Sequence, residues 1–220
     1  MIHTVIDTTA AKLAAFSAQS ATRPQALFSV TPVIHPQNGV RAESSRTFWS
    51  AVSNSLYIRR ENGEDLFGAT PDFAAKLIGC PDLVAHGRRG PIGCDADGVA
   101  DLALWQAADE AAVSDRPSAP VAWHAIGWLP TDMDEAGWRE LVLQFLDERF
   151  VANGMVADWA IHSLPDGESG WIKKPHMHAI ATARFWKGPR LGQPQAAWLA
   201  TARSRSALEA AWTQMPGQLG

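Results

Sequence analysis

Apolar and polar residues alternate twice between residues 155 and 182, which predicts two half-buried β-strands. Because strand side chains point alternately to the two faces of a sheet, each strand has one apolar face. That face carries Ala157, Trp159 and Ile161 on the first strand and Met177, Ala179 and Ala181 on the second. Gly167 and Gly170 lie between the two strands, so we predict a long hairpin.

The opposite face of this hairpin carries Asp158 and three histidines. If His162 lies opposite His176, then Ala160 lies opposite His178, and a shift by one residue would mix the polar and apolar faces. Cross-strand neighbours are about 4.5–5.5 Å apart at Cβ, so the three imidazoles would converge as ligands of a divalent metal. The alternative is that the His-Met-His sequence places two histidines on the protein surface.

Apolar spacing and capping signals predict the other elements. We expect strands over 26–34 and 121–129, and helices over 8–20, 44–60, 71–78, 99–113, 134–152 and 206–214. The glycine-rich segment 79–98 is predicted to be a loop or an exposed hairpin. This order predicts an α+β fold with a largely antiparallel central sheet covered by helices, with the histidine hairpin at its centre.

Composition describes an ordinary globular protein, with 46% hydrophobic and 19% charged residues among 220. We expect a single domain over 25–220, after an N-terminal extension over 1–24 to which we assign no role. The sequence shows no transmembrane run and no signal peptide, and its two cysteines fit a reducing cytoplasm. The net charge of −4 argues mildly against nucleic-acid binding. The C-terminal segment from residue 173 onward is nevertheless basic, with Lys173, Lys174, Arg184, Lys187, Arg190, Arg203 and Arg205.

Tyr57 is the single tyrosine of the sequence and lies near the end of the predicted helix 44–60. A phenol beside a bound metal can attack a phosphodiester while the cation polarises the phosphate oxygens. A free phenol has a pKa of about 10, so it needs such electrophilic help or a nearby base. The alternative is that Tyr57 is a packing residue of an amphipathic helix.

Four blocks, together spanning about residues 25–185, resemble the MobA/MobL family of plasmid relaxases in the HUH endonuclease superfamily. The first block is the strand 26–34 with the helix 45–59, which contains Tyr57 and ends at Arg59. The second is Leu104-Trp105-Gln106-Ala107, and the third is the segment 138–156. The fourth is Asp158-Trp159-Ala160-Ile161-His162 with Pro175-His176-Met177-His178-Ala179. The last block is the most specific. It is similar to the family's metal-binding hairpin.

The resemblance implies metal-dependent nicking and strand transfer on single-stranded DNA. Tyr57 would be the nucleophile, and His162, His176 and His178 would bind Mg²⁺ or Mn²⁺. The partners would be DNA at an origin-of-transfer-like site and accessory mobilisation proteins, in the cytoplasm. Trp123 and His124 stand where the family usually has Arg-Glu.

Other residues are candidates for supporting roles. Asp109, Glu110 and His124 are candidates to orient the metal ligands through hydrogen bonds. Arg59, Lys173 and Lys174 are candidates to contact DNA phosphates. Three other functions stay open. They are a rolling-circle replication initiator, a non-catalytic DNA-binding protein on a relaxase fold, and a three-histidine metal hydrolase that uses water on a small phosphoester.

Overall fold

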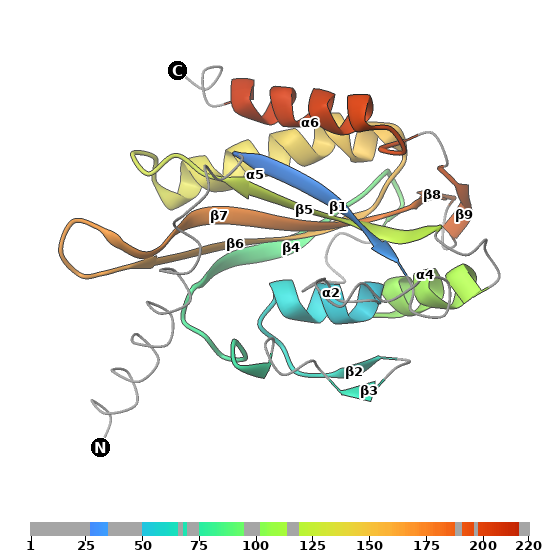
Figure 1. Ribbon diagram of the computed structural model, residues 1–220, viewed down its shortest axis with the longest axis horizontal. Helices are drawn as coiled ribbons and strands as arrows, with labels where there is room; N and C mark the ends of the chain where they lie inside the picture. The colour runs from blue at the N-terminus through green and yellow to red at the C-terminus, as the bar shows by residue number, and fades with distance from the viewer. Residues whose placement is uncertain are drawn as a thin grey trace.

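The protein is described here by a computed structural model. It describes residues 27–34, 50–65, 68–69, 75–94, 102–113, 119–187, 191–195 and 198–215. These residues form a five-stranded antiparallel sheet of order β1-β5-β7-β6-β4, with helices on both faces (Figure 1). The predicted α+β class is therefore confirmed.

The sheet contains β1 (Phe28–Ile34), β4 (Leu83–Arg89), β5 (Pro120–Trp128), β6 (Ala157–Pro165) and β7 (Trp171–Thr182). The helices are α2 (Ala51–Ile58), α4 (Ala103–Val113), α5 (Glu135–Arg149) and α6 (Ala202–Gln214), with a 3₁₀ turn η1 (Val151–Asn153). Two short pairs accompany the sheet: β2 (Glu64–Asp65) with β3 (Gly68–Ala69), and β8 (Arg184–Trp186) with β9 (Leu191–Pro194). Within the described part of the chain, no helix is both long and apolar enough to cross a membrane.

The predicted hairpin and its register are confirmed. β6 pairs with β7 so that His162 lies opposite His176 and Ala160 opposite His178. β7 is the middle strand of the five, which gives the hairpin its predicted central place. Met177 is fully buried on the opposite face, as the alternation required.

The prediction for segment 79–98 was wrong, because the segment contains β4, an edge strand that pairs with β6. Gly87 lies inside this strand for a packing reason. Gly87 lies opposite Trp159, and a Cβ at Gly87 would lie 3.0 Å from the indole ring. A glycine inside a strand often marks such a close approach.

Predicted helix ends were less accurate than predicted helices. α6 begins at Ala202, four residues before the expected start at 206, because Thr201 and Ser204 form a capping box. α5 begins as expected, with Asp134 as its N-cap, but ends at Arg149 before η1. Four parts of the predictions lie outside the described residues: the helix over 8–20, the extension 1–24, residues 44–49 of the helix over 44–60, and residues 71–74 of the helix over 71–78.

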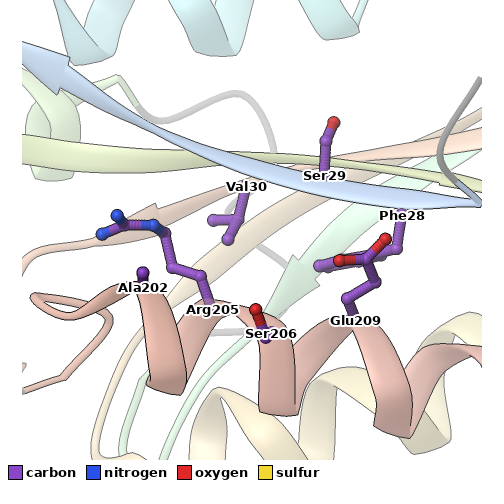
Figure 2. Close-up of a pocket in the computed structure, with 7 residues that line it drawn as sticks. All are labelled: Phe28, Ser29, Val30, Ala202, Arg205, Ser206 and Glu209. Carbon is purple, nitrogen blue, oxygen red and sulfur yellow. The ribbon is translucent and has the colours of Figure 1, made fainter.

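Two hydrophobic cores lie on opposite faces of the sheet. The core under α5 and α6 is rich in aromatic residues, and the core under α2 and α4 is smaller (Figure 1). A pocket of about 320 Å³ lies between β1 and α6, where Arg205 and Glu209 point toward the strand (Figure 2). Its lining contains none of the three histidines, so it is separate from the candidate site below.

Candidate functional site

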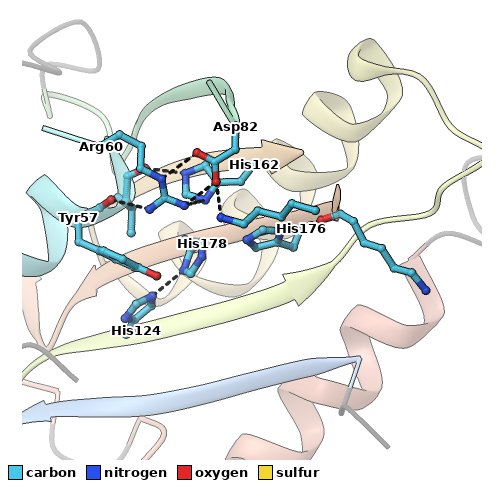
Figure 3. A network of polar contacts seen from close by, with 10 residues as sticks. Tyr57, Arg60, Asp82, His124, His162, His176 and His178 are labelled. Atoms are coloured by element: carbon cyan, nitrogen blue, oxygen red, sulfur yellow. Dashed lines mark hydrogen bonds and ion pairs between the residues drawn. The ribbon is translucent and has the colours of Figure 1, made fainter. Parts of the chain in front are cut away.

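β6 and β7 gather three buried histidines on the sheet face that α2 covers (Figure 3). His162, His176 and His178 each offer one ring nitrogen, and these atoms lie within 4.8 Å of one another. Their ring centroids are 5.0–5.3 Å apart. Three converging imidazoles are a donor set that a divalent cation can bind.

Burial keeps these imidazoles neutral. It lowers the pKa of His176 to about 4 and, with the positive charge of Arg60, holds the pKa of His162 well below its usual range. Burial also holds the pKa of His178 well below that range, with smaller contributions from the neighbouring histidines. Neutral imidazole is the form that binds metal, so the donor set fits a cation at neutral pH.

Hydrogen bonds fix the ring orientation of these histidines. His176 Nδ1 lies 2.8 Å from the carbonyl oxygen of Lys174, which can only accept, so Nδ1 donates and Nε2 keeps its lone pair. His178 Nδ1 lies 2.8 Å from Nε2 of His124 on β5. The structure therefore brings His124 to the site. Its hydrogen bond orients the ring of His178, as residues that support metal ligands commonly do. Burial lowers the pKa of His124 to about 4.

Tyr57 lies beside this cluster, near the end of α2. Its ring contacts His178 edge to face, with centroids 5.5 Å apart, and its centroid is 6.2 Å from that of His124. Figure 3 shows the hydroxyl turned toward these two histidines. Burial raises the pKa of Tyr57, and the positive charge of Arg60 opposes that shift. The phenol is therefore protonated at neutral pH.

Sequence reasoning missed Arg60 and Asp82. Arg60 Nε and Nη2 donate to the two oxygens of Asp82 at 3.0 and 2.9 Å, and Nη2 also lies 2.9 Å from His162 Nδ1. Burial would raise the pKa of Asp82, but hydrogen bonds and positive charge from Arg60, with Lys173, hold it well below its usual range. Asp82 lies in the segment predicted to be a loop or an exposed hairpin, where no partner for it could be predicted. Arg60 follows Tyr57 by three residues, which was a usable signal.

Polar contacts from two other elements position α2. Asp109 on α4 accepts the backbone N–H groups of Ala51 and Val52 at 2.8 and 3.2 Å. It therefore holds the start of α2. Asp158 on β6 accepts from Ser55 at 2.8 Å. The same carboxylate accepts from Trp105 and Arg88, each at 2.6 Å.

The remaining predicted residues lie in different settings. Glu110 is exposed on α4. Arg59 is buried and pairs with Glu61 at 3.3 Å, while Lys173 pairs with Asp82. Lys174 is exposed on β7. Of the three basic residues predicted to contact phosphate, Lys174 is the most exposed to solvent.

This geometry defines a class of site: a three-histidine candidate metal centre with a buried phenol beside it, on a helix-covered antiparallel sheet. The chain matches the MobA/MobL family over residues 70–209 and belongs to that family. Membership identifies it as a plasmid-mobilisation relaxase, with DNA as its implied partner. The matched region includes the three histidines, His124 and Asp82. It begins after Tyr57 and Arg60.

A solved structure supports the fold. It is described as "Molecular Basis of Vancomycin Resistance Transfer in Staphylococcus aureus", and its TM-score to this chain is 0.56 at 20% sequence identity. The alignment covers 77% of this chain and 84% of the other. At that identity the likeness establishes a common fold. No curated protein matches the chain.

Proposed function

We propose that this relaxase nicks single-stranded DNA and transfers the cut strand through Tyr57, at a site that requires a divalent cation. The observation that carries the proposal is the contact between the Tyr57 ring and the ring of His178, a member of the three-histidine cluster. A nucleophile this close to the metal centre could reach a phosphate held there.

The reaction is a transesterification. The Tyr57 oxygen loses its proton and attacks phosphorus, an oxygen–phosphorus bond forms, and the bond to the 3′-oxygen breaks. The 3′-oxygen takes up a proton and leaves as a 3′-hydroxyl, so the DNA end stays attached to Tyr57 through its 5′-phosphate. One phosphodiester replaces another, and the reverse attack therefore rejoins strands without ATP.

The chain's own residues supply the rest of the site. His162, His176 and His178 would hold Mg²⁺ or Mn²⁺, which when bound polarises the non-bridging phosphate oxygens. His124 orients His178 through the 2.8 Å contact between their rings. Lys174, exposed on β7, is the basic residue that we expect to contact the DNA backbone.

Covalent trapping tests the proposal. The full chain is incubated with single-stranded oligonucleotides that include the upstream sequence of its own gene, with Mn²⁺ or with EDTA. We expect a denaturation-stable adduct that needs the cation and is lost in Tyr57→Phe, which removes only the hydroxyl. Glu140→Gln on the exposed side of α5 is the control and should form adduct normally.

Other outcomes decide between functions. An adduct that persists in Tyr57→Phe would remove this residue from the mechanism. Metal-dependent phosphoester hydrolysis that is unchanged in Tyr57→Phe would support the water-using hydrolase instead. Binding of the oligonucleotides without any adduct would support the non-catalytic DNA-binding protein. Nicking at a replication origin instead of a transfer origin would identify a rolling-circle initiator.

A further inference from the structure

We propose that Arg60 competes with the divalent cation for His162, so that metal binding and the Arg60–His162 hydrogen bond exclude each other. The inference rests on the proposed metal centre and concerns how that centre is loaded. It concerns Arg60 and not its neighbour Arg59, which donates Nε–H to the Ser55 carbonyl oxygen and pairs with Glu61.

The argument begins with the two ring nitrogens of His162. Nδ1 lies 2.9 Å from Nη2 of Arg60, and a guanidinium can only donate, so Nδ1 must be the acceptor. Nε2 lies 2.7 Å from the carbonyl oxygen of Ile58, which can only accept, so Nε2 carries the proton. Both nitrogens therefore form hydrogen bonds with residues just after Tyr57, namely Ile58 and Arg60.

The other two histidines differ. His176 donates Nδ1–H to a backbone carbonyl, which leaves the Nε2 lone pair available. His178 has Nδ1 against His124, so its Nε2 faces no such partner among the recorded hydrogen bonds of the described residues. A cation could bind these two histidines at once. To gain the third it must take the His162 lone pair from Arg60.

Arg60 is built into this position. Asp82 binds its Nε and Nη2, and Nη1 donates to the Tyr57 carbonyl oxygen at 2.9 Å. The Arg60 backbone adopts a left-handed conformation with φ of 58°, which costs free energy for a residue with a side chain. A strained backbone that delivers a guanidinium to a candidate ligand is consistent with a functional contact.

Loss of the His162 bond would change what Arg60 can do. Asp82 would still hold the guanidinium, whose carbon lies 5.0 Å from the centroid of the Tyr57 ring. The released Nη2–H would then be a charged donor beside the nucleophile, where a DNA phosphate could accept it. By reciprocity, the phosphate that draws Arg60 away from His162 would strengthen metal binding.

The test is metal affinity without DNA. Calorimetric titration with Mn²⁺ compares the wild-type chain with Arg60→Met, which keeps an apolar stem and removes the guanidinium. We expect Mn²⁺ to bind the variant at least about tenfold more tightly. In the variant, metal binding no longer breaks a charged hydrogen bond between Arg60 and His162 Nδ1. Unchanged or weaker binding would overturn the inference, since a residue that only orients His162 would lower the affinity when removed. Absence of Mn²⁺ binding in both proteins would overturn it too.

Arg88→Met is the matched control. It removes another buried arginine on the same sheet face, whose Nε pairs with Asp158 at 2.6 Å. We expect its Mn²⁺ affinity to equal that of the wild type. An equal gain in both variants would mean that general loosening, and not the loss of competition, raises the affinity, and would overturn the inference.

A measurement on the unchanged protein covers the case in which Arg60→Met does not fold. Nitrogen NMR of ¹⁵N-labelled chain, titrated with Mg²⁺ or Zn²⁺, should show the His162 Nδ1 signal leaving its hydrogen-bonded position as metal binds. Persistence of the Arg60–His162 bond in metal-saturated protein would refute the competition. Neither experiment needs DNA, so failure of the inference is distinguishable from failure of covalent trapping.

Discussion

The two faces of the sheet are built in different ways. Under α5 and α6 the core is made largely of aromatic rings, with Trp212 and Phe145 edge to face at 4.9 Å and Phe28 against both. Under α2 and α4 the apolar core is smaller, and charged and imidazole groups are buried beside it. These are Arg59, Arg60, Asp82, Arg88, Asp109, Asp158, His124, His162, His176 and His178.

The difference shows how one sheet can both fold and hold a reactive site. Burying apolar area stabilises the fold, whereas burying charge costs free energy unless each group is paired. Here the charges are paired so that they hold α2 at three points: Asp109 at its start, Asp158 in its middle and Arg60 after its end. The aromatic face supplies stability, and the polar face fixes the position of Tyr57.

The largest expected effect comes from the aromatic face. Trp212→Ala should lower the free energy of unfolding by about 3–5 kcal/mol, because it leaves a cavity against Phe28 and Phe145. Urea unfolding measures this. Mn²⁺ affinity at a temperature where the variant is folded should be unchanged. A changed affinity would show that the two faces are coupled.

On the polar face, Asp158→Asn should cost a similar amount but also impair the reaction. It leaves Arg88 buried without its carboxylate, and breaking a buried pair in this way costs about 3–5 kcal/mol. It also weakens the contact with Ser55 on α2, so we expect covalent adduct to form more slowly. Equal adduct rates in folded wild type and variant would contradict the positioning role of Asp158.

Lowering the pH should destabilise the protein through the buried histidines of the polar face. His124 and His176 have pKa values of about 4 when folded, below the usual value of 6.5. The unfolded chain therefore binds more protons below pH 6.5, and stability falls as the pH drops from about 6.5 to about 4. Each residue contributes up to about 1.4 kcal/mol per pH unit in this window.

Unfolding free energies measured in urea between pH 7 and pH 4.5, without metal, check this dependence. His124→Gln should make the slope shallower. A metal-free protein whose stability is flat between pH 6.5 and pH 5 would mean that these histidines titrate normally.

The smallest effect concerns two arginines that are adjacent in β4. Arg88 is buried with Asp158, whereas Arg89 is half-exposed and pairs with Asp147 of α5 at 2.6 Å. Exposed ion pairs contribute at most about 1 kcal/mol, so Arg89→Gln should be nearly neutral in thermal unfolding. Arg88→Gln should be much more destabilising. Similar melting temperatures for the two variants would contradict the contrast between the faces.

The features that could be predicted from sequence depend on short-range patterns. The alternation of apolar residues around His162 and His176 set the strand register, and a slip of one residue would have buried the wrong side chains. β4 was missed because the glycine opposite Trp159 serves packing across strands, which one sequence does not reveal.

The supporting residues were harder to predict than the histidines. Asp109 was chosen for its place near the Leu-Trp motif, and the structure shows that it holds the start of α2. Arg59 was chosen over Arg60, and which of two adjacent arginines reaches His162 depends on the left-handed turn after α2. Asp82 accepts a hydrogen bond from Arg60, which lies 22 residues earlier in the sequence. Contacts of this kind arise from tertiary structure and have no local signature.

Tyr57, enclosed by His178, His124 and Arg60, is also the single tyrosine of the chain. A sample enriched with ¹³C in tyrosine alone would therefore give one set of aromatic resonances, all of which report from inside the site. The arrival of a cation, the ionisation of the phenol and the attachment of a DNA strand could each be followed on that one ring. The chain thus carries a spectroscopic probe at its proposed nucleophile without any added label chemistry.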